Sequence, residues 1–433
     1  LLASGFEFPQ SRITVSLGPA EMRKTGGRYD LPVAIGILAA NRELPVSSLR
    51  DVEIFGELAL DGSLRDVTGL LPSVIKAQEA GRAIIVPQGN AAEAMLARAK
   101  VYPASNLREV VDHLAGREVL EPAIAPETCE AASRHPELLD VKGQQFAKRA
   151  LEIAASGFHN LLLIGPPGTG KSMLARRLPG ILPPMAEQEA LDTAAVCSVA
   201  GATVATAAWR MRPFRAPHHT ASAAALVGGG RVLAPGEISR AHNGVLFMDE
   251  LPEFNRTVLE ALREPLETGW ARIARAGMHA DFPARFQLVA AMNPCPCGYL
   301  GDEKSDCRCS RDRVVAYRNK VSGPLLDRID LHVEVLRPST EVLRNGEDGA
   351  ESSATVARRV AGARQVQLQR QGMPNALLDG AALKQVCRID DAGWALLDNA
   401  ADRFNLSARA HQRILRVART IADLGAHKKI APP

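Results

Sequence analysis

The stretch Gly165-Pro-Pro-Gly-Thr-Gly-Lys-Ser172 decides the fold expected for this chain. It follows the apolar run Asn160-Leu-Leu-Leu-Ile164 and precedes the helix-compatible run Met173-Leu-Ala-Arg-Arg177. In a strand–loop–helix of this kind, glycines let backbone N–H groups fold around phosphate oxygens, and the partly positive helix N-terminus faces them. The pattern predicts that Lys171 reaches the β and γ phosphates of a nucleoside triphosphate, ATP in the simplest case, and that Ser172 places its hydroxyl on Mg²⁺. The residues expected to wrap the phosphates are Gly165, Pro166, Pro167, Gly168, Thr169 and Gly170.

Size and composition narrow the classes of protein to consider. With 433 residues the chain is long enough for two or three domains. Its net charge is only +4, and it has no basic tail or acidic block that would predict a partner from overall charge. Any contact with nucleic acid must therefore come from a small group of basic residues. No run approaches the roughly 18 apolar residues that span a bilayer, and no signal-peptide pattern opens the chain, so no membrane contact is expected. Seven cysteines, four of them clustered, favour the reducing cytoplasm, with a metal as one candidate ligand, over a disulfide framework.

Apolar periodicity and breaks divide the chain into four segments. Residues 1–117 alternate expected strands (12–17, 54–60, 83–86) with expected helices (31–40, 70–80), as in an α/β or α+β domain. A Pro-rich linker follows over 118–140, and a helix near 144–155 opens an α/β core over 141–340. After a low-complexity break at 345–353, helices are expected at 354–371, 379–387, 391–403 and 407–424, within a helical segment 341–433. The start at Leu1 and the stop at Pro433 suggest a chain truncated at both ends.

Two further apolar strands end in polar residues suited to phosphate chemistry. Val245-Leu-Phe-Met248 runs into Asp249 and Glu250, and a strand from Phe286 ends at Asn293. Parallel α/β sheets place ligands at the carboxyl ends of their strands. Asp249 is therefore predicted to hold Mg²⁺, Glu250 to align and deprotonate the attacking water, and Asn293 to orient that water beside the γ-phosphate. The alternatives are two exposed acids at a strand end and a turn-forming Asn before a proline.

Two arginines complete the predicted hydrolytic site. Arg328 lies in Leu325-Leu-Asp-Arg-Ile-Asp330, a helix-length interval after the strand that ends at Asn293, and Arg409 opens the last expected helix. In an oligomeric ATPase one arginine acts on the neighbouring subunit's γ-phosphate, and another senses the nucleotide from the lid. The alternative for each arginine is a surface ion pair.

Four cysteines form a cluster directly after Asn293. Cys295 and Cys297 make one C-x-C pair, and Cys307 and Cys309 make a second. Four thiolates suit tetrahedral Zn²⁺, and the intervening Gly298 and Gly301 allow the loop to turn back on itself. The single-residue spacing is tighter than the usual two to four, so free thiols and a redox disulfide remain open beside zinc.

Beyond the nucleotide motifs, several longer stretches resemble the magnesium-chelatase-like branch of the AAA+ superfamily, and more closely the ComM/YifB competence family. The resemblance covers nearly the whole chain. The stretches that carry it are Phe214-Arg-Ala-Pro-His-His-Thr-Ala-Ser222, Pro235-Gly-Glu-Ile-Ser239, Leu246-Phe-Met-Asp-Glu-Leu-Pro-Glu-Phe254, Asn293-Pro-Cys-Pro-Cys-Gly-Tyr299, Ser322-Gly-Pro-Leu-Leu-Asp-Arg-Ile-Asp-Leu-His332 and Leu406-Ser-Ala-Arg409.

The resemblance implies a fold and an activity. The expected fold is an α/β AAA+ core with a parallel sheet, an extra hairpin in its second helix and a helical lid, preceded by a partial α+β domain similar to the Lon protease domain. The expected activity is that of a hexameric, Mg-ATP-driven DNA helicase that moves branch points when imported DNA is recombined. In this family Arg328 matches the finger position and Arg409 the lid-sensor position. The alternative is a magnesium-chelatase-type ATPase subunit that acts through a partner enzyme.

The N-terminal segment departs from the Lon pattern at the residues that carry peptidase chemistry. Lys24-Thr-Gly-Gly-Arg-Tyr-Asp-Leu-Pro32 resembles the nucleophile turn, but Arg28 stands where the serine belongs. Lys76 lies near the position of the family's lysine, yet without a serine it has nothing to activate. The segment is therefore predicted to be a proteolytically inactive scaffold, which disfavours an ATP-dependent protease.

Two inserts carry arginines that are candidates for binding branched or single-stranded DNA. The first spans 210–240 and the second is an expected hairpin over 269–277. In a hexamer such inserts would project into a central pore and hold phosphates by charge. The alternative is that they are solvated loops or subunit contacts. Their basic residues are Arg212, Arg215, His218, His219, Arg231, Arg240, Arg272 and Arg275.

Overall fold

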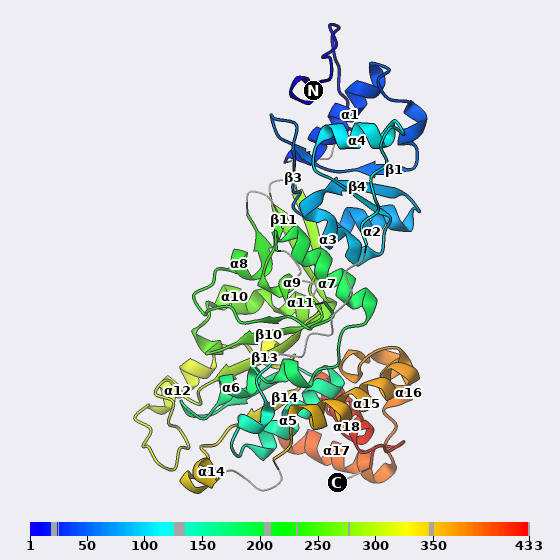
Figure 1. Ribbon diagram of the computed structural model, residues 1–433. Coiled ribbons are helices and arrows are strands. Elements are labelled where there is room, and N and C mark those ends of the chain that lie inside the picture. The colour runs from blue at the N-terminus through cyan, green and yellow to red at the C-terminus, as the bar shows by residue number, and fades with distance from the viewer. Residues whose placement is uncertain are drawn as a thin grey trace. The chain divides into compact units, whose positions relative to one another are not determined.

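The computed structural model describes residues 1–18, 24, 26–124, 135–202, 209–230, 233–275, 278–345 and 350–431. The chain forms two compact units. The first contains residues 1–131 together with 187–209, and the second contains 132–186 together with 210–433. The element order is traced in Figure 1.

The first unit is built on a three-stranded parallel sheet, in the order β1-β4-β5. Its strands are β1 (Val52–Ile54), β4 (Ala83–Pro87) and β5 (Val101–Ala104), and a small antiparallel pair joins β2 (Glu57–Leu58) to β3 (Leu64–Arg65). The helices are α1 (Asp30–Ala40), α2 (Leu71–Glu79), α3 (Ala91–Ala94) and α4 (Leu107–Leu114). The expected helices at 31–40 and 70–80 and the strand at 83–86 are confirmed, and the expected strand 54–60 is divided between β1 and β2.

The expected strand at 12–17 is wrong. These residues form no regular element in the structure, and no described strand pairs with them. Alternating apolar residues satisfy only half of what a strand requires, because its backbone groups also need a neighbouring strand to bond.

A helix from the middle of the sequence also belongs to the first unit. Helix α7 (Glu187–Val199) lies within the range 141–340 that was expected to form the core, yet it packs with the first unit's helix α2. Ala194 is buried in the same apolar cluster as Leu70 and Val74, and Leu191 and Trp209 pack against that cluster. The backbone N–H of Leu71 donates to the Ser198 hydroxyl at 3.2 Å.

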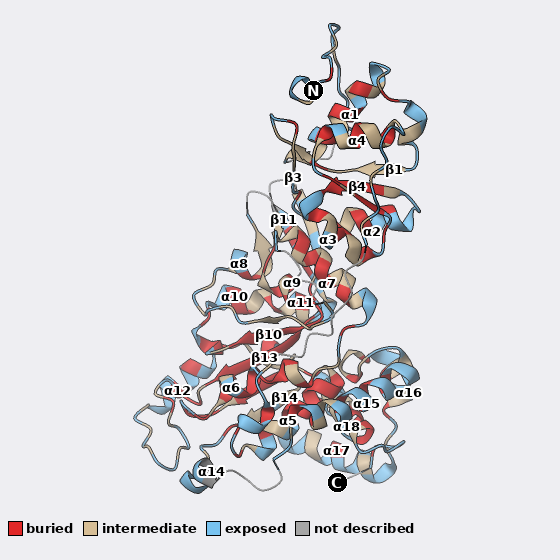
Figure 2. Cartoon of the chain, in the orientation of Figure 1, coloured by how far each residue is buried: buried red, intermediate tan, exposed pale blue. Residues whose placement is uncertain are grey.

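The second unit centres on a five-stranded sheet with the order β14-β6-β13-β10-β7, and every neighbouring pair is parallel. The strands are β6 (Leu161–Ile164), β7 (Phe214–Arg215), β10 (Val245–Met248), β13 (Gln287–Met292) and β14 (Leu331–Glu334). Strands β10 and β13 are buried along their full length, as Figure 2 shows in red. Their continuous apolar sequences are typical of parallel strands covered on both faces.

Helices and hairpins surround this sheet. The helices are α5 (Gln145–Gly157), α6 (Lys171–Ala175), α8 (Ala223–Val227), α9 (Glu237–Arg240), α10 (Arg256–Ala261), α11 (Arg263–Thr268), α12 (Arg311–Arg318), α13 (Gly323–Leu326) and α14 (Thr340–Asn345). A short hairpin of β8 (Gly228–Gly229) and β9 (Ala234–Pro235) lies between α8 and α9. A longer antiparallel hairpin joins β11 (Trp270–Arg275) to β12 (Met278–Pro283).

The last part of the second unit is helical, as the sequence predicts. Its helices are α15 (Ser353–Gln371), α16 (Gly380–Val386), α17 (Asp391–Phe404) and α18 (Ala408–Leu424). A buried polar network holds α18 in place: the Asp423 carboxylate accepts hydrogen bonds from Arg370 at 2.7 and 2.9 Å and from Asn375 at 2.8 Å. Arg419, which is also buried, lies 3.0 Å from the same carboxylate. None of the helices in the described ranges is long and apolar enough to cross a membrane.

Candidate nucleotide site

The phosphate loop connects β6 to α6 in the predicted strand–loop–helix order. Gly168 and Gly170 have φ angles of 76° and 94°, in the left-handed region where glycine is favoured. The Lys171 ammonium is buried and donates to the carbonyl oxygens of Gly165 and Pro166, at 2.6 and 2.8 Å. Burial lowers the pKa of Lys171, and the nearby Asp249 and Glu250 carboxylates oppose this shift. Thr169 is buried as well, and its hydroxyl donates to Pro166 at 3.0 Å.

Three neighbouring strands bring the predicted polar residues to one edge of the sheet. Strand β13 lies between β6 and β10, so Gly165, Asn293 and Asp249 each directly follow the carboxyl end of one of three adjacent strands. The Ser172 hydroxyl donates to Asp249 at 2.5 Å, and Lys171 donates to the Asn293 amide oxygen at 3.1 Å. A hydroxyl next to a carboxylate offers two hard oxygen ligands, the type that Mg²⁺ prefers. The geometry therefore joins Lys171, Ser172, Asp249 and Asn293 into one site.

Glu250 lies beside this group in an unusual backbone conformation. Its φ angle is 53°, a left-handed value that costs a non-glycine residue on the order of 1–3 kcal/mol. Its side chain is partly exposed, and its Oε2 atom lies 3.4 Å from Nδ1 of His219. Strain retained at the tip of a buried strand is typical of functional positions.

The sequence did not predict that His219 lies near the nucleotide site. This histidine was considered only as part of a basic insert, whereas the structure pairs it with Glu250 and sets its ring edge-on to Phe254, with centroids 6.5 Å apart. His218 packs against His219 with ring centroids 4.1 Å apart. The adjacent histidines in Phe214-Arg-Ala-Pro-His-His219, directly after β7, were the available signal.

The two predicted arginines lie together on one carboxylate. Arg328 donates through Nη2 to Glu267 and through Nη1 to the Pro324 carbonyl at 2.6 Å. Arg409, from the start of α18, donates to the other Glu267 oxygen at 3.3 Å. The hydrogen bond from Arg328 is the main cause of the lowered pKa of Glu267. The structure thus brings the finger candidate and the lid-sensor candidate into one cluster.

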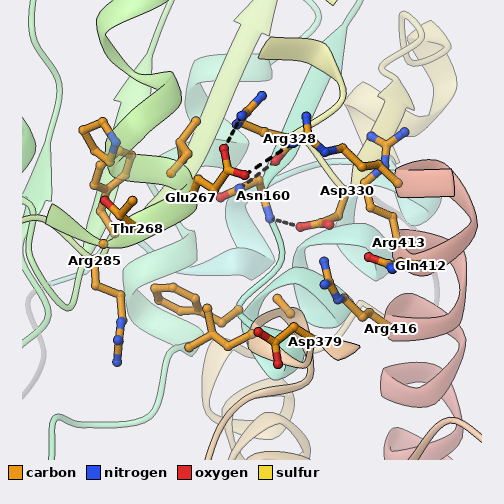
Figure 3. Close-up of a pocket in the computed structure, with 18 of the residues that line it drawn as sticks. Asn160, Glu267, Thr268, Arg285, Arg328, Asp330, Asp379, Gln412, Arg413 and Arg416 are labelled. Atoms are coloured by element: carbon orange, nitrogen blue, oxygen red, sulfur yellow. Dashed lines mark hydrogen bonds and ion pairs between the residues drawn. The ribbon is translucent and has the colours of Figure 1, made fainter. Parts of the chain in front are cut away.

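That cluster lines a cavity of about 570 Å³ at the boundary of the core and the lid helices, shown in Figure 3. Five arginines contribute to its lining: Arg285, Arg328, Arg409, Arg413 and Arg416. Among the described residues, the lining includes none of the phosphate-loop positions 165–172. Four carboxylates share the lining: Glu267, Asp327, Asp330 and Asp379. Glu267 pairs with Arg328 and Arg409, so an anion brought by another molecule would have to displace this carboxylate to reach the two arginines.

In the first insert, the arginines of the described part are bound within the protein. Arg212 donates to the carbonyls of Pro183 and Asn243, both at 2.7 Å. Arg215 makes a two-pronged pair with Glu237 at 2.7 and 2.8 Å, and Arg240 lies 3.5 Å from the same carboxylate. These contacts favour an internal structural role for the three arginines. Arg231 lies outside the described residues.

The β11–β12 hairpin leaves a basic residue exposed. It extends over 270–283, beyond the expected 269–277; Gly277 and the Arg275 side chain lie outside what the structure describes. Arg272 is 61% exposed and lies 3.6 Å from Glu264 and 3.9 Å from Asp281, its cross-strand neighbour. Such long, exposed pairs hold an arginine weakly.

The two residues that the sequence comparison set against the Lon peptidase pattern, Arg28 and Lys76, make surface contacts. Arg28 donates to the Thr68 carbonyl at 2.9 Å. The Lys76 side chain is 76% exposed, and its ammonium pairs with Glu79 at 2.7 Å, one helical turn away. No serine lies at position 28 to pair with this lysine, as the inactive-scaffold prediction requires.

The four clustered cysteines converge on one point. Their sulfur atoms all lie within 4.8 Å of one another; the four residues are Cys295, Cys297, Cys307 and Cys309. None of the four is joined in a disulfide, and the same holds for Cys197 and Cys387 among the described residues. The cluster follows Asn293 along the chain and so lies next to the nucleotide site.

Comparison with known proteins gives a consistent assignment for this arrangement. The family described as magnesium chelatase, subunit ChlI, matches residues 137–343; its C-terminal family matches 350–433, and the family described as subunit ChlI of Mg-chelatase matches 1–90. The chain is 48% identical to competence protein ComM of Haemophilus influenzae, over 100% of this chain and 86% of that protein. It is also 48% identical to YifB of Salmonella typhimurium, over 98% and 83%. The magnesium-chelatase 38 kDa subunit of Rhodobacter capsulatus is 29% identical, over 46% and 55%.

The parallel sheet, the strand-end residues and these similarities along the whole length agree with one another. The chain belongs to the ComM/YifB family of magnesium-chelatase-like AAA+ proteins.

Proposed function

We propose that this protein is a Mg-ATP-driven motor that acts on DNA, in the form of a ring of identical subunits. The observation that carries the ATP part is the meeting of Lys171, Ser172, Asp249 and Asn293 at one sheet edge, with Glu250 beside them. Membership in a magnesium-chelatase-like AAA+ family supports ATP hydrolysis and a requirement for Mg²⁺.

The residues divide the work of hydrolysis in a simple way. The backbone of residues 165–170 and the Lys171 ammonium bind the phosphates, and Ser172 and Asp249 are placed to hold Mg²⁺, which neutralises the charge that develops on the phosphates. Glu250 takes the proton of the attacking water, since its carboxylate is partly exposed at the mouth of the site. Asn293 orients the same water with its amide while it holds Lys171.

The shared position of Arg328 and Arg409 supports a ring assembly, six-membered in the family pattern. Both lie away from the chain's own phosphate loop and on the same carboxylate. A neighbouring subunit that presents its γ-phosphate to this cluster would displace Glu267 and receive two positive charges. Arginines supplied from outside the nucleotide-binding chain stabilise the transition state for phosphoryl transfer.

The choice of DNA as substrate rests on the ComM relative, a competence protein, together with the exposed hairpin arginine Arg272. A motor engaged in competence acts on branched or single-stranded DNA that has entered the cell, in the cytoplasm. Arg272 lies between buried Ala271 and Ile273 on the opposite, exposed face of a two-stranded hairpin, so its side chain is held at a fixed place where it can contact a phosphate.

A second candidate is supported by the similarity to the 38 kDa magnesium-chelatase subunit. In that case ATP turnover would depend on a partner enzyme and would not respond to DNA. The 46% coverage of this chain by that relative, against 100% by ComM, favours the DNA motor.

One experiment separates these functions. Steady-state ATP turnover is measured without DNA, with forked DNA and with a four-way junction, for the wild-type chain and for Glu250→Gln. We expect turnover that branched DNA stimulates and that falls by about 10²–10⁴ in Glu250→Gln, as for loss of a general base, while ATP binding persists. Turnover that is indifferent to every DNA form would refute the DNA part, and unchanged turnover in Glu250→Gln would refute the assignment of the base.

A further inference from the structure

The cysteine cluster is a built site that the proposed function does not use. The Cys295 and Cys297 sulfurs are 3.4 Å apart, and the Cys307 sulfur lies 3.7 Å from Cys295 and 3.6 Å from Cys297. A tetrahedral metal with metal–sulfur bonds of about 2.3 Å places its ligand sulfurs about 3.8 Å from one another. A disulfide would need about 2.05 Å. The sulfur positions fit a shared metal and do not fit a disulfide.

We propose that Cys295, Cys297, Cys307 and Cys309 bind one structural Zn²⁺ ion. Four soft thiolates in a closed tetrahedral set select zinc over Mg²⁺, which requires oxygen ligands. Four thiolates would fill the tetrahedral coordination of Zn²⁺, which is the arrangement of a structural site.

The loop overcomes its short C-x-C spacing by turning at glycine. Gly298 and Gly301 have φ angles of 87° and 81°, and the Gly298 N–H donates to the Cys295 carbonyl at 3.0 Å. The backbone N–H groups of Tyr299 and Arg308 hydrogen-bond to the Cys297 sulfur. Donors of this kind neutralise the net negative charge that four thiolates around one Zn²⁺ retain.

The site adjoins the phosphate loop. A Cβ atom on Gly298 would lie only 2.6 Å from Cδ of Pro167, so the cysteine loop packs directly on the loop that wraps the phosphates. Arg318 donates to the Pro294 carbonyl at 3.2 Å, and Arg337 pairs with the buried Asp302 carboxylate at 3.3 Å. Zinc would therefore fix both the segment that follows Asn293 and the wall behind Pro167.

Elemental analysis of the full chain tests the site without reference to ATP. We expect one zinc per chain in the wild type and in the control Cys197→Ser, a cysteine outside the cluster, and loss of the zinc in Cys297→Ser and Cys309→Ser. Metal-free wild type should take up one equivalent of Zn²⁺, or of Co²⁺ with the visible spectrum of tetrahedral thiolate coordination. These wild-type measurements decide the question even if the serine variants do not fold.

Three results would overturn the proposal: no zinc in the wild type and no uptake of added Zn²⁺, four freely titrating thiols in zinc-supplemented protein, or iron in place of zinc. The expected effect on ATP rests on the proposed function and is read separately. Removal of the zinc should weaken ATP binding, because Pro167 loses its support, and added Zn²⁺ should restore it. A chain that binds zinc but not ATP would keep the metal site and refute the proposed function.

Discussion

The arrangement of Arg328 and Arg409 on Glu267 predicts that both arginines act on a neighbouring subunit's nucleotide. Substituting Arg328, whose side chain is 12% exposed, removes its ion pair with the half-exposed Glu267 and its hydrogen bond to the Pro324 carbonyl. Together these losses should cost the fold about 1–2 kcal/mol. Loss of an arginine finger, in contrast, lowers turnover by about 10³–10⁵, or at least about 4 kcal/mol of transition-state stabilisation. Arg328→Ala should therefore be folded and nearly inactive.

Mixing inactive chains distinguishes action on the neighbour from action on the chain's own nucleotide. Lys171→Ala lacks a working phosphate loop but keeps both arginines. In a random 1:1 ring of Lys171→Ala and Arg328→Ala, about one interface in four combines an intact loop with an intact arginine. We expect the mixture to recover up to about a quarter of wild-type ATP turnover, and a mixture of Lys171→Ala with Arg409→Ala to recover a similar fraction.

The two mixtures give different results if Arg409 acts on the nucleotide of its own chain. If Arg409 acted on its own chain's nucleotide, every chain in the second mixture would carry one defect at its own site and no activity would return. Recovery in the first mixture alone would thus refute the shared role, and recovery in neither would refute action on the neighbour. Arg82→Ala, which breaks an ion pair with Glu53 in the first unit, serves as a control and should change neither turnover nor mixing.

Three further outcomes follow from the described contacts. His219→Ala should lower kcat by about tenfold with little change in KM, because the imidazole orients Glu250 and a misplaced base slows only the chemical step; an equal rise in KM would contradict this. Arg272→Ala should weaken DNA binding and reduce the slope of log affinity against log salt by about 1, as measured by fluorescence anisotropy; an unchanged slope would place the DNA contact elsewhere. Asp423→Ala should destabilise the second unit by about 3–5 kcal/mol in urea unfolding, because it leaves buried Arg419 without its carboxylate, whereas the exposed Asp398→Ala should cost less than about 0.5 kcal/mol.

The features that could be predicted from the sequence are those that neighbouring residues determine. The phosphate loop can be predicted because its glycines, lysine and serine lie within one short stretch of sequence. Asp249 and Asn293 can be predicted because each directly follows a continuous apolar strand. The four lid helices were placed within a residue or two by apolar periodicity and by stop signals such as Gly372.

The features that sequence reasoning missed depend on packing between distant segments. His219 and Glu250 are separated by 31 positions (250 − 219), and only the parallel pairing of β7 with β10 brings their ends together. The meeting of Arg409 with Arg328 depends on where α18 packs, which its own sequence does not state. The strand expected at 12–17 failed for the same reason, because a pattern cannot supply the neighbouring strand.

Helix α7 has a practical consequence for dissecting the protein. The chain enters the second unit after residue 131, leaves it at 187 and re-enters at 210, so no single cut separates the two units. A fragment that begins near residue 135 would carry α7 without the cluster that buries Ala194 and shields Leu191 and Trp209. In such a fragment the apolar face of α7 would be exposed to solvent, and we expect the fragment to aggregate on expression. If a short Gly/Ser linker replaces 187–209, we expect a fragment of the second unit that stays in solution and keeps the nucleotide site.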